Sequence, residues 1–338
     1  MIISTLGIDI AKSVFQVHGV DADGQTILQK KLRRAAFLDF LTQIEPCLVG
    51  MEACATSHYW ARELARFGHD VRLIPPSYVK PYLKRQKNDA TDAEAICEAV
   101  SRPNMHFVPI KTQEQQGVLM LHRSRDLLMR QRTMLLNVAR AHLAEFGVAF
   151  AQGPSQTLKV LEELRQGTTI DGIPDFAIKA LLSLGDQLNH LQDEVKNIEL
   201  QLKLWHKSNV DSQRLESIPG IGLITATALC ASVPDPSCFK SGRQFAAWLG
   251  LVPRQNSSGG KERLGRITKM GNKYLRRLLV IGATSVIWHS SKHQTRNALW
   301  VNKLKSQKNH RLVTVAIANK TARIVWALLS KGESYRAS

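Results

Sequence analysis

Four acidic side chains in the first hundred residues have the types and the spacing to bind divalent metal ions. Asp9 ends the first β-branched apolar run of the chain, and Glu52 ends the second apolar run. Asp89 and Asp92 lie three residues apart at the start of a predicted helix, so both can point from one helical face. Carboxylate oxygens are the ligands that Mg²⁺ and Mn²⁺ prefer, and two such ions can clamp a scissile phosphate. The four residues therefore predict metal-dependent cleavage or transfer of a phosphodiester.

A purely structural role for the same acidic residues is the alternative at this point. Asp89 could serve as the N-cap of the helix, and Asp92 would be favourable in its first turn because the helix N-terminus is positive. Spacing alone leaves both interpretations open.

The order of the predicted elements favours the metal site. Hairpin signals predict a three-stranded antiparallel meander, which is followed by alternating helices and strands. This is the order of an RNase H-like α/β fold, in which carboxylates at the ends of the first strand, the fourth strand and the last helix hold metal. The predicted strands cover 2–9, 14–20, 26–32, 47–52 and 70–74, and the predicted helices cover 35–44, 57–67 and 92–100.

The charge of the chain indicates a polyanionic partner. The formal net charge is +18, with an isoelectric point near 9.9. Residues 240–338 hold 20 Lys and Arg against only Glu262 and Glu333, whereas the remainder of the chain is neutral overall. A cationic surface of this kind attracts nucleic acid, with an affinity that depends steeply on salt. Cationic patches also occur on lipid-binding proteins, but no clean amphipathic basic helix dominates this region.

Length and composition predict a cytoplasmic protein of two or three domains. The 338 residues suffice for ample cores, and no signal peptide precedes the first strand. The apolar run from Leu278 to Trp288 is interrupted by polar residues and is too short to span a bilayer, so no membrane association is expected. The five cysteines form no C-x-x-C pair, which predicts reduced core residues and no zinc site.

A long helical region is predicted in the middle of the chain. The stretch 113–146 lacks Pro and is rich in Leu, Met and Arg, and a loop follows around 166–174. Apolar residues then recur with alternating gaps of three and four from Leu181 to Leu202, which is a heptad seam. The seam could form an intermolecular coiled coil that dimerises the protein, or it could pack on the chain's own core.

A glycine-rich turn over 218–222 has the pattern of a helix-hairpin-helix motif. Gly220 and Gly222 would let backbone N–H groups approach phosphate oxygens. A tight turn between two helices that binds no phosphate can also use glycine, and this is the alternative.

The stretch 245–277 combines an apolar helix with a Ser-Ser-Gly-Gly loop that is surrounded by cations. A serine hydroxyl in such a loop could attack a phosphate, with Arg and Lys offsetting the charge of the transition state. A solvent-exposed hinge is the alternative. The residues expected to contact nucleic acid are Gly220, Gly222, Arg254, Lys261, Arg263, Arg266, Lys269, Lys273, Arg276 and Arg277.

Five ordered blocks of the chain resemble the DEDD-type transposases of bacterial insertion sequences, a family related to the Piv DNA invertase and understood as bridge-RNA-guided recombinases. The resemblance covers nearly the whole length. The blocks are Gly7 to Lys12, Met51 to Ala53, Asp89 to Ala93, Ile218 to Gly222 and Leu251 to Gly259.

This resemblance implies specific roles for five residues. Asp9, Glu52, Asp89 and Asp92 would form the carboxylate tetrad that binds Mg²⁺, or alternatively Mn²⁺, in a RuvC-like domain. Ser258, which directly precedes a glycine, would be the nucleophile, with its neighbour Ser257 leaving an ambiguity of one residue.

The resemblance also implies partners and a domain order. The partners are donor and target DNA, a non-coding bridge-type guide RNA and further copies of the chain, as a dimer or a dimer of dimers. The location is the bacterial cytoplasm, at the nucleoid. We expect a RuvC-like domain over 1–108, a helical coiled-coil region over 109–210 and a mainly α-helical, serine-bearing transposase domain over 211–338.

The predicted function is site-specific transposition of an insertion sequence through a phosphoserine intermediate. Two alternatives remain at this stage: a metal-dependent nuclease of Holliday-junction type without a covalent step, and a non-catalytic RNA- or DNA-binding protein. A covalent protein–DNA adduct separates the first from the second, and divalent-metal dependence of cleavage separates both from the third.

Overall fold

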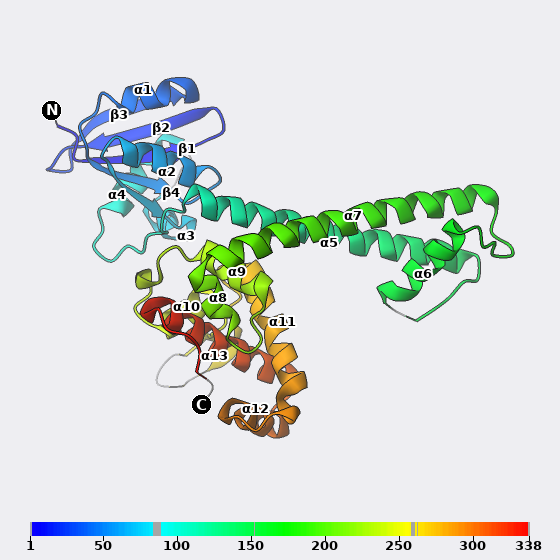
Figure 1. Ribbon diagram of the computed structural model, residues 1–338. Helices are drawn as coiled ribbons and strands as arrows, with labels where there is room; N and C mark the ends of the chain where they lie inside the picture. The colour runs from blue at the N-terminus through cyan, green and yellow to red at the C-terminus, as the bar shows by residue number, and fades with distance from the viewer. Residues whose placement is uncertain (1, 84–88, 152, 258–260, 262, 337–338) are drawn as a thin grey trace. The chain divides into compact units, whose positions relative to one another are not determined.

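Five strands near the N-terminus form one mixed sheet, in the order β3-β2-β1-β4-β5 (Figure 1). The first three strands are antiparallel neighbours, and β4 and β5 run parallel to β1. The predicted meander and the two later strands are therefore confirmed. Their bounds are Thr5–Ile10 (β1), Val14–Val20 (β2), Thr26–Arg33 (β3), Leu48–Glu52 (β4) and Asp70–Ile74 (β5).

The structure is a computed structural model, and it describes residues 2–83, 89–151, 153–257, 261 and 263–336. The side chain of Asp89 lies outside this description, although its helical position is within it. By contacts, the chain forms two compact units. Unit 1 comprises 1–116 and 231–244, and unit 2 comprises 117–230 and 245–338. The three-region division made from the sequence stays a prediction.

Helices cover both faces of the sheet in unit 1 because the strands alternate their side chains. Leu6 and Ile8 point into a core with the aromatic residues Phe37 and Trp60, which belong to α1 (Phe37–Leu41) and α2 (Ser57–Arg66). Gly7 points to the opposite face, which α4 (Asp89–Val100) covers. The predicted helix over 92–100 thus begins three residues earlier, at Asp89. Short helical segments complete the unit: Arg34–Ala36 (η1), Pro76–Val79 (α3), Lys80–Tyr82 (η2) and Pro236–Cys238 (η3).

Two helices of more than thirty residues dominate the first part of unit 2. They are α5 (Gln113–Glu145), which begins at the end of unit 1, and α7 (Asp175–Ser208), with α6 (Pro154–Arg165) between them in the chain. The three helices share one apolar core (Figure 1). The long helices and the loop before α7 were predicted, but α6 was not.

The heptad seam of α7 packs within its own chain. Leu181 and Leu188 belong to the core shared with α5 and α6, and Leu202 is also fully buried. Of the two interpretations of the seam, the structure therefore favours packing on the chain's own core. A different apolar stripe remains exposed on α5, where Met120, Leu127 and Met134 recur every seven residues.

The rest of unit 2 is a set of shorter helices around one hairpin. Its elements are α8 (Val210–Glu216), α9 (Leu223–Ser232), α10 (Gly242–Trp248), β6 (Pro253–Gln255), β7 (Leu264–Ile267), α11 (Lys273–His289), η4 (Ser290–Lys292), α12 (Arg296–Gln307) and α13 (His310–Lys331), of which α9 and α10 extend across the unit boundary. The sequence analysis missed α13, which is long and apolar enough to cross a membrane by those criteria alone. Its buried side chains include Val313, Ile317 and Val325, and it packs against α11, so it is a core helix of unit 2.

The cysteine prediction needs one correction. All five cysteines are free thiols, as expected. Cys54 and Cys238 are exposed, however, so only Cys47, Cys97 and Cys230 are core residues. Burial raises the pKa of Cys230 to about 12, which makes this thiol inert.

Candidate functional site

Asp9, one residue before the end of β1, and Glu52, the last residue of β4, lie on the same face of the sheet at the carboxyl ends of two neighbouring parallel strands. The register pairs Ile8 of β1 with Met51 of β4, so the next residues along, Asp9 and Glu52, are neighbours across the strands. Gly7 and Gly50 face α4, and residues two positions further along a strand return to the same face. Both carboxylates are half-buried on the face that α4 covers.

The helix α4 brings its N-terminus to the same end of the strands. A Cβ at Gly7 would lie 2.2 Å from the carbonyl oxygen of Ala93 and 2.4 Å from the amide nitrogen of Cys97, so the backbone of α4 rests directly on β1. Because Cys97 lies beside Thr5 and Ala93 lies beside Gly7, the helix runs antiparallel to β1. Its first turn, with Asp89 and Asp92, therefore lies toward Asp9. We call Asp9, Glu52 and this first turn the carboxylate edge.

Asp92 has the property expected of a metal ligand in a structure without metal. Its Oδ1 atom is buried and has no hydrogen-bond partner. A buried carboxylate oxygen without a partner is costly, and a cation would remove that cost. Among the side chains that the structure describes, no three His, Cys, Asp or Glu lie at metal-holding spacing, and that description excludes Asp89. The donor types and the orphaned oxygen fit a divalent cation, with Asp89 as the member that would complete the set.

The loop after Glu52 is strained and electronegative. Thr56 has a φ of 72°, which is unusual for a β-branched residue, and such strain concentrates at functional sites. Burial raises the pKa of the Cys54 thiol, and the negative charges of Glu52 and Asp9 raise it further. The Cys54 sulfur thus feels the negative charge of both carboxylates, which indicates that Asp9 and Glu52 both lie close to it.

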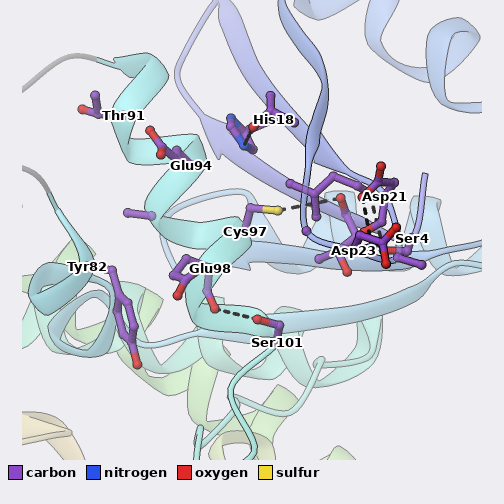
Figure 2. A pocket seen from close by; sticks show the side chains of 16 residues that line it. Ser4, His18, Asp21, Asp23, Tyr82, Thr91, Glu94, Cys97, Glu98 and Ser101 are labelled. Carbon is purple, nitrogen blue, oxygen red and sulfur yellow. Dashed lines mark hydrogen bonds between the residues drawn. The ribbon is translucent and has the colours of Figure 1, made fainter. Parts of the chain in front are cut away.

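A cavity of about 650 Å³ flanks α4 on the side of β2 (Figure 2). Glu94 and Glu98 line it from α4, and Asp21 and Asp23 line it from the turn after β2. Of the described side chains, those of Asp9, Glu52 and Asp92 do not line it. Four acidic side chains repel a phosphate backbone, so this cavity is not where we expect DNA to lie.

The predicted serine loop lies in the chain between β6 and β7, which pair as a short β-hairpin in unit 2. Strands β6 and β7 pair Pro253 with Ile267 and Gln255 with Leu264. At the base of the hairpin, Gly250 and Gly271 allow two backbone segments to pack in direct contact. A Cβ at Gly271, for example, would lie 1.8 Å from the carbonyl oxygen of Trp248. The base of this serine hairpin is therefore fixed.

The two neighbouring serines differ in what the structure says of them. The Oγ of Ser257 accepts a hydrogen bond from the backbone N–H of Arg263 at 3.1 Å, which ties the two sides of the hairpin together. Ser258, with Gly259 and Gly260, lies outside the described residues. The local contact gives Ser257 a structural role.

The cations expected to bind nucleic acid fall into two groups. Arg254, Lys261, Arg263, Arg266, Lys269 and Lys273 are exposed on or beside the hairpin. Arg276 instead donates to the carbonyl oxygens of Leu249 (3.0 Å) and Met270 (2.7 Å), and Arg277 forms an ion pair with Asp126 of α5. These two arginines hold the hairpin base and α11 in place within unit 2.

The two glycines of the 218–222 turn also have different surroundings. A Cβ at Gly220 would lie 2.7 Å from the carbonyl oxygen of Gly282 in α11, and one at Gly282 would lie 1.9 Å from the oxygen of Gly220. Close packing of the turn on α11 thus accounts for Gly220, whereas a Cβ at Gly222 would meet open space. Phosphate binding by this turn stays a prediction.

A buried polar network that the sequence analysis missed joins three helices of unit 2. His122 of α5 lies 3.0 Å from the Tyr274 hydroxyl of α11 through Nδ1, and 3.0 Å from Thr227 Oγ1 of α9 through Nε2. Burial, together with the charge of Arg125, lowers the pKa of His122 to about 4, so this ring is neutral. A lone histidine in a long helix gives no such signal in sequence.

Comparison with known proteins places the chain among transposases. Residues 6–147 match a family model described as "Transposase", for the DEDD domain of IS110 elements, and residues 212–298 match the model "Transposase IS116/IS110/IS902 family". The carboxylate edge falls within the first match and the serine hairpin within the second.

Similar proteins extend over the whole chain. A "Probable family 20 transposase" of Pseudomonas aeruginosa is 47% identical over 99% of both chains. The "Transposase for insertion sequence element IS1328" of Yersinia enterocolitica is 40% identical over 98% of both, and that of IS1111A from Coxiella burnetii is 40% identical over 99% of this chain and 92% of its own. The protein is an enzyme of this class: it belongs to the IS110/IS116 family of insertion-sequence transposases with a DEDD domain.

Proposed function

We propose that the protein recombines DNA through a phosphoserine intermediate at Ser258, with a divalent ion held by Asp9, Glu52, Asp89 and Asp92 in an RNase H-like, RuvC-like domain. Family membership supports DNA as the substrate and divalent-metal use by the DEDD domain. The choice of Mg²⁺, with Mn²⁺ as a substitute, follows from the all-carboxylate donor set.

The observation that supports this proposal most is the arrangement of the carboxylate edge. Two carboxylates end adjacent parallel strands, and a helix that carries two more aspartates runs antiparallel over them. Asp92 contributes a buried oxygen that lacks a hydrogen-bond partner. When bound, a divalent ion would supply Lewis-acid stabilisation of the charge that develops on the phosphate oxygens.

The protein's own groups account for the covalent step. The Ser258 hydroxyl attacks the phosphorus, a Ser Oγ–P bond forms, and the P–O bond to one DNA strand end breaks. The serine proton is lost, and the departing DNA oxygen gains one, so the released end is a hydroxyl. Attack of a DNA hydroxyl on the phosphoserine reverses these changes after strand exchange. One phosphoester is present throughout, so no external energy source is required.

The exposed cations of the serine hairpin would bind the DNA backbone and offset the charge of the pentavalent phosphorus. They stand on both strands of the hairpin and on the turn behind it. Gly222, at the start of α9, would allow the close approach of a further phosphate.

We further propose that a non-coding bridge RNA guides the protein to donor and target DNA in the bacterial cytoplasm, at the nucleoid. The charge of residues 240–338 supports a second polyanionic partner. The exposed stripe of Met120, Leu127 and Met134 supports a homo-oligomer, a dimer or a dimer of dimers, because this heptad spacing is what a helix of a second copy would pack against.

Trapping of the adduct tests the proposal. Full-length protein incubated with its element's terminal DNA and Mg²⁺ should form a covalent protein–DNA adduct whose phosphate maps to Ser258. Ser258→Ala should lose both the adduct and strand exchange, because no adjacent group supplies an equivalent oxygen.

The control is the neighbouring serine. Ser257→Ala should keep the adduct, since the Ser257 hydroxyl serves the hairpin. A phosphate on Ser257 would move the nucleophile by one residue. Cleavage without an adduct in Ser258→Ala would instead identify a metal-dependent nuclease in which water attacks.

A further inference from the structure

A pocket of about 410 Å³ in unit 2 combines cationic and aromatic side chains. It lies between α12, α13 and the segment that follows α13, and its volume is within the range of about 300–1,000 Å³ typical of small-ligand sites. The lining residues on which the argument rests are Arg296, Asn297, Trp300, Lys320, Tyr335 and Arg336. We call this the α12–α13 pocket.

Among the residues that the structure describes, nothing neutralises the positive charge of the pocket. Its described lining residues include no Asp or Glu, and the ion pairs between described residues include none of Arg296, Lys320 and Arg336. Burial lowers the pKa of Lys320, and the charges of Arg323 and Arg296 lower it further. Cations held together in this way favour an anion between them.

The aromatic part of the pocket is held in place. The Lys320 ammonium lies 4.3 Å from the centre of the Trp300 ring and donates to Asn297 Oδ1 at 2.8 Å, which fixes the indole against α13. Gly332, with a φ of 66°, ends α13, and the Tyr335 N–H then donates to Ser217 Oγ at 3.3 Å. The Trp300 ring and the backbone of Tyr335 are therefore both held in place beside the pocket.

These two chemistries match the two parts of a nucleotide. A phosphate binds to guanidinium and ammonium groups, and a base stacks on an aromatic ring only when it is not already stacked in a duplex. We propose that the α12–α13 pocket binds one unpaired nucleotide of a single-stranded nucleic acid, with its phosphate at Arg296 and Arg336 and its base against Trp300 or Tyr335. The proposal rests on the transposase family and not on the phosphoserine step.

The pocket is also connected to the serine hairpin. Asn319, the neighbour of Lys320 on α13, donates through Nδ2 to the carbonyl oxygen of Leu251 at 3.1 Å, two residues before β6. A strand anchored in the pocket would therefore be held by the same helix that supports the base of the hairpin.

The first test compares two charge reversals on opposite faces of α12, Arg296→Glu and Lys305→Glu, by their effect on the binding of single-stranded nucleic acid. Full-length protein carrying Ser258→Ala, so that no covalent step occurs, is titrated with labelled single-stranded oligouridine and oligothymidine. Arg296→Glu should weaken binding about tenfold or more. Lys305→Glu makes the same charge change nine residues along the helix, on the opposite face, and should have a much smaller effect because Lys305 does not line the pocket.

The aromatic contact is tested at Tyr335. Tyr335→Ala should weaken binding, and Tyr335→Phe should restore it because the ring remains. Photo-crosslinking to 5-iodouridine-containing strands should modify Trp300 or Tyr335. Tighter binding of oligouridine would identify an RNA strand as the source of the nucleotide, and tighter binding of oligothymidine a DNA strand.

Three results would overturn the proposal: equal losses for Arg296→Glu and Lys305→Glu, wild-type binding by Tyr335→Ala, or equal competition by a blunt duplex, whose bases are stacked. These measurements are made in the Ser258→Ala background. A failure of the phosphoserine proposal would therefore leave their interpretation unchanged.

Discussion

The carboxylate edge of unit 1 and the serine hairpin of unit 2 position their functional groups in opposite ways. Asp9 and Glu52 stand at the ends of buried strands whose register is fixed by a two-sided core. The hairpin cations stand on strands of three and four residues that are exposed almost throughout, above a base fixed by glycine contacts. A metal site needs converging oxygens at fixed distances, whereas a phosphate backbone needs only charge within reach.

This difference implies different tolerance to substitution. Each proposed metal ligand of the edge has no substitute, because its position is set by the sheet or by α4. The hairpin cations act together, so the loss of one leaves most of the field intact.

The largest effect is expected from direct comparison of the two regions. Asp9→Asn should abolish recombination, by about a thousandfold or more, while DNA binding is kept, because it removes one charge from a metal site and none from the cationic surface. Arg266→Ala on the hairpin should weaken DNA binding only severalfold and flatten its salt dependence slightly. Strand-exchange rates and binding titrations at several salt concentrations measure both. Near-normal recombination by Asp9→Asn in Mg²⁺ would remove the metal-site interpretation.

The same contrast between buried and exposed side chains can be tested at Leu188 of α7 and Met134 of α5. Leu188 is 0% exposed and Met134 is 65% exposed. Leu188→Asp should lower the free energy of unfolding by at least about 3 kcal/mol, since a charge replaces a core side chain. Met134→Asp should leave the unfolding transition nearly unchanged and shift the mass measured by light scattering toward the monomer. An unchanged mass would mean that the α5 stripe is not the contact between copies.

The buried His122 should make the free energy of unfolding depend on pH, which an exposed histidine of unit 2 would not do. The folded-state pKa of His122, about 4, lies below its ordinary value of 6.5, so only the unfolded chain gains a proton between these pH values. The free energy of unfolding should therefore fall by about 3 kcal/mol as the pH drops from 6.5 to 4, with no contribution from this residue above pH 6.5. Denaturant titrations at several pH values should show that the free energy of unfolding falls less steeply between pH 6.5 and pH 4 in His122→Gln than in the wild type. Identical slopes would mean that the ring is accessible to protons in the folded state.

The smallest effect is expected from Ser257→Ala, a change within the serine hairpin. Ser257→Ala removes the hydroxyl that accepts from the Arg263 N–H, an exposed contact of about 0.5–1.5 kcal/mol at most. We expect recombination to fall no more than severalfold, with full adduct formation. A loss as complete as that of Ser258→Ala, with the adduct phosphate of the wild type mapped to Ser257, would make Ser257 the nucleophile.

The elements of unit 1 could be predicted from the sequence more completely than those of unit 2. The five strands and α2 were predictable because buried strands carry β-branched runs and end at polar residues, whereas the convergence of the four carboxylates stays a prediction. The helix α13 was missed, since a helix buried on several sides has no simple apolar period. The helix α12 was missed because it buries only Ala298 and Val301, which is too few apolar residues to give a period. Ser257 illustrates a further limit: its bond to Arg263 depends on a hairpin register that no local pattern encodes.

The site residues of unit 2 depended on resemblance rather than on pattern. Arg276 and Arg277 looked like their exposed neighbours in sequence, yet each is engaged within unit 2. His122 gave no signal, because its partners are more than one hundred residues away in the chain. Long-range polar contacts of this kind are specified by tertiary structure alone.

The division of unit 1 into two chain segments has a consequence for synthesis on the ribosome. Residues 1–116 supply the whole sheet, but 231–244 join the unit only after 117–230 have been translated. At about 5–20 residues per second, the incomplete unit would wait on the order of ten seconds for its last segment. During that interval the strands that carry Asp9 and Glu52 are already synthesised, on a nascent chain that lacks its serine hairpin. The two halves of the candidate chemistry therefore become available in sequence, and a truncated product released early would carry the acidic site alone.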